Sequence, residues 1–306
     1  MNYEEIKKFK TKKSEFGLCK YDDRICFFKK SDERLKYNIL KKYYKVPKLL
    51  DKYNNTLIYE YIPSMINNTI HEYLYLGGNY FKGDIIFNQY KEALNSICLM
   101  NEDMLENRKY FKGRINLLKK YIDLGLFTSD VNKIINDVIY YIDLNKKLYA
   151  FISNGDPTDT NISLDGYFCD YECAGYNSIV GEITIFTVSI LSHGMYFYPK
   201  YNSDAYKIRP YILNHFNDYK PSYKIKLPLK NKEVLLKYLD FYNKNLNILE
   251  KENVNKYLKY YIIMRLLTPI DVSKMDLDDK RVIIIYVTKF ININSLDELI
   301  QFILNC

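Results

Sequence analysis

The feature that most constrains the fold is a change of sequence pattern at Pro63. Before it, "EFGLCKYDD" and "RICFFKK" predict two strands joined by a turn at Asp22-Asp23, and "VPKLLD" and "TLIYEYIP" predict two more strands around "KYNN". Between these pairs, "SDERLKYNILKKYY" has apolar residues at helical spacing behind Ser31, which we expect to cap the helix. The order strand, strand, helix, strand, strand indicates a small α+β lobe with a mixed or antiparallel sheet over residues 1–62.

After Pro63 the pattern is mostly helical. "DIIFNQYKEALNSICLMNEDML" and "SDVNKIINDVIYYIDL" repeat apolar residues at helical spacing, the second behind a cap at Ser129 or Asp130. A β-like "VIIIYV" lies inside the last of the further helices, which we expect over 179–195, 229–249, 253–267 and 279–304. We therefore expect an α+β fold of two lobes: a small sheet-rich N-terminal lobe, residues 1–62, and a large, mostly helical C-terminal lobe, residues 63–306.

Composition limits the classes of protein that the chain can belong to. With 306 residues, 33 Tyr, 16 Phe and no Trp, it has room for two lobes and for a largely aromatic core. The net charge of +8 is spread along the chain, as in "KKFKTKK", which predicts a solvated basic surface and no nucleic-acid partner. The six cysteines form no CxxC pair and favour reduced thiols, and the three histidines have no HxxxH spacing, which argues against zinc.

The sequence also predicts no membrane partner. The N-terminus "MNYEEIKKFK" has no apolar core of a signal peptide. The longest apolar run, Ile179 to Leu191, contains Glu182 and is too short to span a bilayer. We therefore expect a cytoplasmic protein.

Polar residues with an ordered spacing lie in "FISNGDPTDTNISLDGYFCDYECAGYNS", after the buried strand predicted for "KLYAFIS". Asp156 and Asn161 have the spacing D-x-x-x-x-N, and the "DG" turn between "NISL" and "YFCDY" predicts a hairpin that brings Asp170 close to Asn161. An amide and a carboxylate oxygen suit Mg²⁺ that carries nucleotide phosphates. Asp156, placed opposite, would accept a proton from an attacking hydroxyl. Taken alone, D-x-x-x-x-N is also the pattern of an ordinary polar turn.

These residues carry a resemblance to a known family. "NGDPTDTNI" followed by "FCDYECAGYN" resembles the catalytic segment of the aminoglycoside phosphotransferase and choline/ethanolamine kinase superfamily, roughly H-x-D-x-x-x-x-N, a hairpin, and [IL]-D-[WFY]-E. The resemblance implies a two-lobed, protein-kinase-like fold. It also implies that Asp156 is the catalytic base and that Asn161 and Asp170 hold Mg²⁺. It also implies that Glu172 assists a second metal ion or binds a positively charged substrate.

The same resemblance assigns nucleotide-binding roles in the N-terminal lobe. Lys29 or Lys30 of "RICFFKK" stands where the family has the lysine that binds the nucleotide phosphates. We prefer Lys29, because strand alternation puts it on one face with Ile25 and Phe27. Glu33, in the following helix, is the expected partner of this lysine, although an acid at this place also suits the helix dipole.

"LIYEYIP" resembles the linker between the lobes, where backbone groups of Tyr59, Glu60 and Tyr61 would bind the adenine. Two positions depart from the family pattern. Asn154 stands in place of the histidine that precedes the base, and asparagine can donate and accept hydrogen bonds in its place. Glu182 stands in place of a structural aspartate. No G-x-G-x-x-G sequence is present.

The resemblance implies a small-molecule kinase that transfers the γ-phosphoryl group of ATP or GTP to a hydroxyl of a small metabolite or antibiotic, with Mg²⁺. Its partners would be a nucleoside triphosphate and a small alcohol, neutral or monocationic because basic residues outnumber acidic ones beyond residue 195. Two alternatives stay open. One is a kinase-fold module that binds a nucleotide or a partner with weak or no transfer; the other is a helical protein with a coincidental acidic loop.

Overall fold

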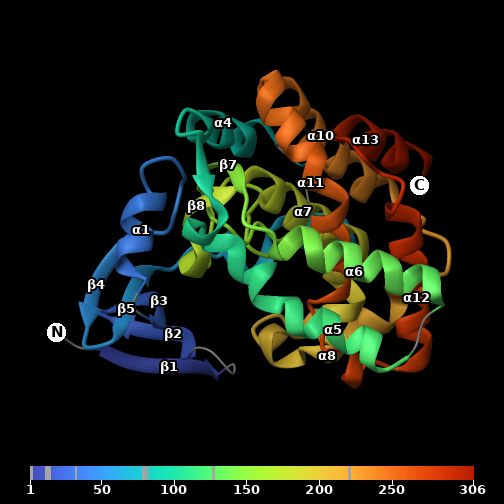
Figure 1. Ribbon diagram of the computed structural model, residues 1–306. Coiled ribbons are helices and arrows are strands. Elements are labelled where there is room, and N and C mark those ends of the chain that lie inside the picture. Colours follow the sequence, from blue (N-terminus) through green and yellow to red (C-terminus); the bar gives the residue numbers. More distant parts are fainter. Residues whose placement is uncertain are drawn as a thin grey trace.

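A small antiparallel sheet and a larger helical part make up the molecule (Figure 1). The computed structural model describes residues 3–10, 15–31, 33–77, 81, 83–125, 128–219 and 222–306. The sheet is built from β1 (Tyr3–Lys10), β2 (Glu15–Tyr21), β3 (Arg24–Lys30), β4 (Leu49–Tyr53) and β5 (Thr56–Glu60), in the order β1-β2-β3-β5-β4. The predicted α+β fold, with a sheet-rich N-terminal lobe and a mostly helical C-terminal lobe, is confirmed.

The predicted β2–β3 turn is present. Asp22 and Asp23 both have positive φ, 45° and 62°, as a two-residue hairpin turn requires. The helix that follows, α1 (Arg34–Leu40), begins three residues after Ser31 rather than next to it. Glu33 takes the N-cap position, so the prediction of a Ser31 cap was wrong.

The strand β1 was not expected, because "KKFKTKK" was interpreted as a basic surface. Its eight residues pair with β2 from Tyr3 opposite Tyr21 to Lys10 opposite Glu15. Of its described side chains only Phe9 is buried. Lysines on an exposed edge strand block further strand pairing, and this explains why a strand can have so little apolar alternation.

The chain passes from sheet to helices around Pro63, since β5 ends at Glu60 and α2 (Ser64–Asn67) follows. The helical part contains long helices joined by shorter helical turns, including a π-helical stretch over Ser189–Phe197. The remaining helices are α3 (Ile70–Tyr75), α4 (Gly83–Leu94), α5 (Ile115–Asp123), α6 (Ser129–Asp143), α7 (Ile179–Val188), α8 (Tyr198–Tyr201), α9 (Pro210–His215), α10 (Leu229–Asn245), α11 (Ile248–Leu267), α12 (Leu277–Phe290) and α13 (Leu296–Asn305).

Three segments differ from the expected helices and strands. The helix predicted through "ICLMNEDML" ends at Leu94, and Cys98–Asn101 forms strand β6. It pairs with β7 (Lys147–Ser153), which pairs in turn with β8 (Gly175–Ser178) in an antiparallel sheet. The helix expected over 279–304 is divided into α12, which contains the "VIIIYV" run, and α13. The predicted "DG" hairpin is reduced to one bridge, Ile162 with Phe168.

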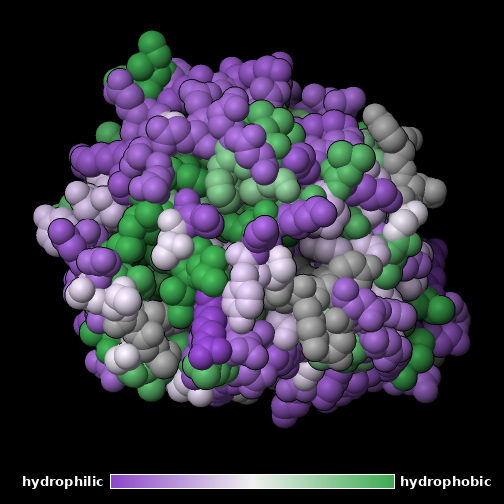
Figure 2. Space-filling view, turned by 90° about the vertical axis from the view of Figure 1, so that its right-hand side faces the viewer, coloured by the Kyte–Doolittle hydropathy of each residue, from purple (hydrophilic) through white to green (hydrophobic). Residues whose placement is uncertain are grey.

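The helical part has a continuous, aromatic core. Tyr90 lies at its centre, fully buried and in edge contact with Tyr44, Phe168, Tyr238 and Tyr242. A separate small core in the sheet lobe consists of Cys19, Cys26, Phe28 and Ile58. Figure 2 shows the face farthest from the sheet lobe, where hydrophilic residues predominate and apolar residues gather near the middle. Among the described residues, no helix is long and apolar enough to cross a membrane.

Candidate functional site

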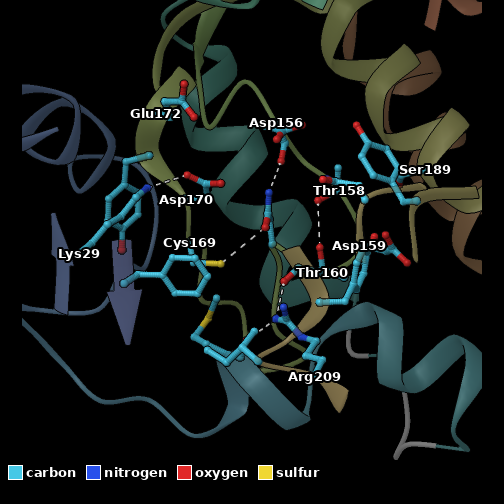
Figure 3. A pocket seen from close by; sticks show the side chains of 18 of the residues that line it. Lys29, Asp156, Thr158, Asp159, Thr160, Cys169, Asp170, Glu172, Ser189 and Arg209 are labelled. Carbon is cyan, nitrogen blue, oxygen red and sulfur yellow. Dashed lines mark hydrogen bonds and ion pairs between the residues drawn. The ribbon is translucent and has the colours of Figure 1, made fainter. Parts of the chain in front are cut away.

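A cleft of about 560 Å³ lies between the two lobes. The sheet lobe contributes residues of β3 and β5 to its wall, among them Lys29 (Figure 3), and residues 60–62 also line it. The helical lobe contributes loop residues that follow β7 and two segments farther along the chain. The lining from the helical lobe includes residues 156, 158–161, 169–172, 198–209 in part, and 269–271.

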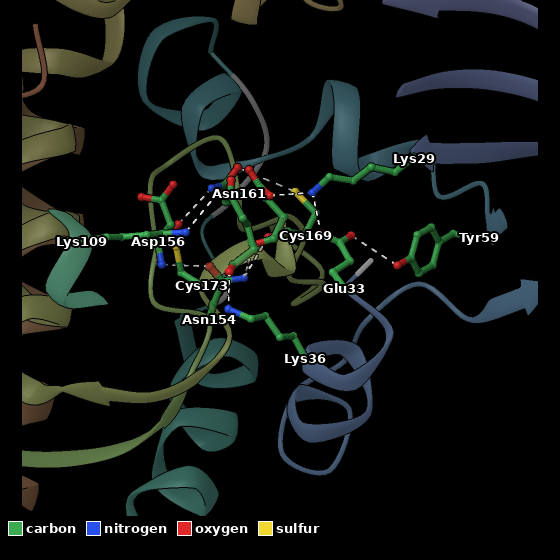
Figure 4. Close-up of polar contacts among 12 residues, drawn as sticks. Lys29, Glu33, Lys36, Tyr59, Lys109, Asn154, Asp156, Asn161, Cys169 and Cys173 are labelled. Carbon is green, nitrogen blue, oxygen red and sulfur yellow. Dashed lines mark hydrogen bonds and ion pairs between the residues drawn. The ribbon is translucent and has the colours of Figure 1, made fainter. Parts of the chain in front are cut away.

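Lys29 lies at the point where the two lobes meet in this cleft. Its Nζ is 2.8 Å from Glu33 Oε2 and 2.8 Å from Asp170 Oδ1, and Tyr59 donates a hydrogen bond to Glu33 Oε1 at 3.3 Å (Figure 4). Burial acts to lower the pKa of Lys29, but the two carboxylates outweigh it and raise that pKa. Lys29 in turn lowers the pKa of Asp170. The group is therefore a cation between two carboxylates that hold it in position.

Lys30 lies elsewhere. Its Nζ is 3.0 Å from Glu15 Oε2 of β2 and 3.3 Å from Glu5 Oε1 of β1. Side chains alternate along β3, so Lys29 and Phe27 line the cleft while Lys30 does not. Of the two lysines left open by the sequence, the structure brings only Lys29 to Asp170.

Asp156 follows β7 through a tight bend. Gly155 has φ +75°, and a Cβ at this residue would lie 2.4 Å from Cys173 O, so only glycine fits. Asn154 donates through Nδ2 to Cys169 O at 2.8 Å and to Asp170 O at 3.2 Å. Its Oδ1 accepts a hydrogen bond from Asp156 N at 3.1 Å. Asn154 thereby connects the two halves of the predicted site.

The Asp156 carboxylate is held on one side only. Tyr110 donates a hydrogen bond to Oδ2 at 3.1 Å. Oδ1 is buried without a hydrogen-bond partner in the described part of the chain, and the Arg265 Nη2 is 3.8 Å from it. Burial raises the pKa of Asp156, and the Arg265 charge opposes this rise. Oδ1 is thus an acceptor oxygen without a donor.

Asn161 and Asp170 supply oxygen atoms that fit Mg²⁺. Asn161 donates through Nδ2 to Asp156 O at 2.9 Å, which turns its Oδ1 toward Cys169, whose Sγ is 3.8 Å away. Asp170 has a left-handed backbone, with φ 57°. Among the described residues no group of three or more His, Cys, Asp or Glu side chains is placed to hold a metal ion. One amide and one carboxylate still suit Mg²⁺, which takes few protein ligands and keeps water and phosphate oxygens.

Glu172 lines the same cleft, but its carboxylate is engaged by a lysine. Lys109 Nζ is 3.1 Å from Glu172 Oε1, and Lys36 donates to the Glu172 carbonyl at 2.6 Å. Lys36 also pairs with Glu106 at 2.8 Å, so these lysines tie the loop to α1 and to the segment before α5. The metal or substrate role expected for Glu172 stays a prediction.

The predicted linker residues Tyr59, Glu60 and Tyr61 also line the cleft. Tyr59 is buried and its hydroxyl serves Glu33, whereas Glu60 is exposed and its backbone N donates to Lys48 O at 2.8 Å. Tyr59 and Glu60 are the last residues of β5, which pairs with β3, the strand that carries Lys29. Their role in binding a base stays a prediction.

Glu182 is fully buried below the loop that carries Asp156. It accepts hydrogen bonds from Ser153 Oγ at 2.8 Å and from Tyr90 OH at 3.3 Å. Burial raises the pKa of the Glu182 carboxyl to about 8. Glu182, which is longer than the aspartate expected at this position, therefore holds the end of β7 through Ser153.

Sequence reasoning missed several residues around Asp156. Tyr110 and Arg265 reach it from segments far away in the chain, and no spacing marks one tyrosine among 33. A buried pair, His71 Nδ1 with Asp159 Oδ2 at 2.7 Å, reaches the cleft through Asp159, which lines it. Nothing in the sequence indicates this contact, because His71 lies near the start of a helix and Asp159 lies in a distant "TDT" turn.

No protein-family model matches the sequence, and no curated protein matches it. Among solved structures, the chain is similar to an ethanolamine kinase from Plasmodium vivax. The identity is 12% and the TM-score 0.47, over 94% of this chain and 81% of that one. The function of the chain must therefore be inferred from the residues of its own cleft.

Proposed function

We propose that the protein is a small-molecule kinase that transfers the γ-phosphoryl group of ATP or GTP to an alcohol hydroxyl. The observation that carries this proposal is the Lys29–Asp170 ion pair, which lies in one cleft with Asp156 and Asn161. Phosphoryl transfer needs a cation for the phosphates, oxygen ligands for a metal ion and a carboxylate for the acceptor hydroxyl. Lys29 offers the cation, Asn161 and Asp170 offer the oxygen ligands, and Asp156 offers the carboxylate.

Lys29 would bind the nucleotide phosphates. It is fixed by Glu33 and stays protonated, since the neighbouring carboxylates raise its pKa. Tyr59 and Tyr61 at the end of the cleft, with the apolar side chains of Ile62 and Met65 beside them, offer a surface for the base. The nucleotide would therefore lie along the wall that the sheet lobe contributes.

Asn161 and Asp170 would hold Mg²⁺, which neutralises the charge of the phosphates when it is bound. Asn161 is held for this role by its hydrogen bond to Asp156 O. Asp170 is held by Lys29 and, through its carbonyl, by Asn154. The chain thus fixes both oxygen ligands before any ligand arrives, which lowers the cost of ordering them.

Asp156 would orient the acceptor and receive its proton. The acceptor oxygen forms a bond to the γ-phosphorus while the bond to the β–γ bridging oxygen breaks, and the nucleoside diphosphate leaves. The hydroxyl proton passes to the carboxylate of Asp156, which lines the cleft. Tyr110 on Oδ2 keeps the carboxylate from turning.

The test is turnover of ATP and GTP against a panel of alcohols and antibiotics, with Asp156→Asn as the test variant. Asp137→Asn, an exposed aspartate of α6, is the matched control. We expect acceptor-dependent turnover that falls by roughly 10²–10⁴ in Asp156→Asn, with nucleotide affinity retained. Unchanged turnover in Asp156→Asn would contradict the role of Asp156. Mg²⁺-dependent nucleotide binding without transfer to any acceptor would point to a binding module.

A further inference from the structure

The part of the cleft next to Asp156 has a wall made by the helical lobe alone. We call Tyr110, Arg114, Asp271 and Lys274 the far wall, since all four line the cleft and Lys29 of the sheet lobe does not belong to it. Arg114 directly precedes α5, and residues 271–274 follow α11. An acceptor whose hydroxyl meets Asp156 would contact this wall.

The acid of the far wall is already neutralised. Lys120 Nζ lies 2.5 Å from Asp271 Oδ2. Ser273 donates to Asp271 Oδ1 through its backbone N at 3.1 Å and through Oγ at 2.8 Å. Both oxygens of Asp271 therefore have donors, and this carboxylate offers little attraction to a cationic substrate.

The cations of the far wall are not neutralised. Arg114 donates through Nη1 to a backbone carbonyl, Thr268 O, at 3.1 Å, and its guanidinium lies 5.1 Å from the centre of the Tyr110 ring. Lys274 is exposed. Within the described ranges, neither cation has a carboxylate at ion-pair distance.

A third cation lies behind Asp156. Arg265 is 2% exposed, and its guanidinium also lies 5.1 Å from the Tyr110 ring centre. Its Nε and Nη1 have no hydrogen-bond partner among the described residues, and Asp156 is its carboxylate neighbour at 3.8 Å. Arg265 lies next to Asp156, and Arg114 and Lys274 line the same cleft, so three positive charges accompany one carboxylate that has no other ion pair in the part of the chain that the structure describes. Such a surplus in a partly enclosed cleft attracts anions and repels cations.

Resting on the proposed kinase function, we propose that the acceptor alcohol carries an anionic group, a carboxylate or a phosphate, which Arg114 and Lys274 bind while its hydroxyl meets Asp156. Arginine binds either group through two parallel N–H donors, and only Nη1 of Arg114 is used in its bond to Thr268 O. An ammonium group at the same place would face two like charges. This proposal departs from the neutral or monocationic alcohol expected from the sequence.

The test compares four alcohols on one three-carbon skeleton: glycerol, glycerate, glycerol 3-phosphate and 3-amino-1,2-propanediol, with inorganic phosphate as a further probe. Binding is measured by calorimetry in the presence of Mg²⁺ and ADP, so that the nucleotide site is filled, and turnover is measured with ATP. The variants are Arg114→Gln and Lys274→Gln. Lys119→Gln, an exposed lysine of α5, is the matched control.

We expect glycerate or glycerol 3-phosphate to bind at least about tenfold more tightly than glycerol and the amine, a difference of about 1.4 kcal/mol. Comparing glycerate with glycerol 3-phosphate shows whether the site prefers a carboxylate or a phosphate. Arg114→Gln and Lys274→Gln should each reduce this preference about tenfold, and Lys119→Gln should leave it unchanged. Lys274 is exposed, so its variant tests the idea even if Arg114→Gln folds poorly.

Preference for the amine, or no binding of any anionic probe to the wild type, would overturn the inference. A loss of ATP affinity in the two variants, without a change in anion preference, would also overturn it, because the cations would then serve the triphosphate. Anion binding that depends on Arg114, together with no phosphorylation of any alcohol, would support an anion site at the far wall but reject the kinase function, and with it the role of the anion as acceptor.

Discussion

Lys29 of β3 and Asp170 of the helical lobe form an ion pair whose atoms lie 2.8 Å apart, 141 residues apart in the chain. The pair joins the two walls of the cleft at the place where phosphates would bind. Lys29 is 13% exposed as a side chain, so its charge is largely removed from water and depends on its carboxylate neighbours. The ion pair therefore connects the two lobes and also forms part of the candidate site.

Replacing Lys29 by Met should weaken nucleotide binding by at least about tenfold, since a charge-assisted contact to phosphate is lost. The matched change Lys30→Met should have little effect, because Lys30 pairs with Glu5 and Glu15 outside the cleft. Titration of ATP and GTP with a fluorescent nucleotide analogue measures both variants. Equal losses in the two variants would show that Lys29 has no special role.

Replacing Asp170 by Asn should abolish the dependence of nucleotide affinity on Mg²⁺, because one of two protein ligands loses its charge. Wild-type affinity should fall when EDTA is added, and the affinity of Asp170→Asn should not change. Glu172→Gln is the control, since Lys109 holds that carboxylate. Calorimetry with and without Mg²⁺ gives the comparison. If Glu172→Gln loses Mg²⁺ dependence and Asp170→Asn keeps it, the ligand assignment is wrong.

Replacing Asn154 by Ala should destabilise the fold by about 1–3 kcal/mol and slow turnover, because it leaves Cys169 O, Asp170 O and Asp156 N without their partner. Asn154→His, which restores a donor and an acceptor, should recover part of both losses. Urea unfolding and the turnover number are the two measurements. An Asn154→Ala variant with wild-type stability would mean that hydrogen bonds to water replace those of the Asn154 side chain.

Glu182 should make stability depend on pH. Burial raises the pKa of its folded carboxyl to about 8, above the value of 4.5 for an exposed group. The native state therefore binds more protons than the unfolded state between these values, and stability falls as pH rises through them. The slope from this group approaches about 1.4 kcal/mol per pH unit.

Glu182→Gln removes the titration and should flatten this slope, which urea unfolding from pH 5.5 to 8.5 measures. The exposed Glu252→Gln serves as the control. Parallel stability curves for wild type and Glu182→Gln would show that Glu182 does not titrate in this range.

The sequence predicted elements whose signals are local. The Asp22-Asp23 turn needs only two residues that accept positive φ, and β7 is a short apolar run. The β6 strand was missed because apolar residues at helical spacing continue past Leu94, where α4 ends. The strand β1 was missed because its residues face solvent, so alternation of polarity is absent. Local pattern carries no information about which segments become neighbours.

For the site, spacing within one segment predicted Asp156, Asn161 and Asp170 together. It also favoured Lys29 over Lys30 through strand alternation, and the structure places Lys29 against Asp170. Tyr110 and Arg265 were not predicted, because their contact with Asp156 is formed only by the packing of helices that are distant in the chain. Charge balance along the sequence likewise did not show that Asp271 is neutralised and Arg114 is not.

Gly155 limits how this protein can change. A Cβ there would lie 2.4 Å from Cys173 O and 2.5 Å from the Asn177 side chain, and the backbone has φ +75°. Any other residue would push the Asp156 loop away from the segment that carries Asp170. In a library with all amino acids at position 155, we therefore expect survivors of selection to encode glycine, whichever acceptor is offered. New acceptor specificity will have to arise through the far wall, where side chains can vary without moving the loop.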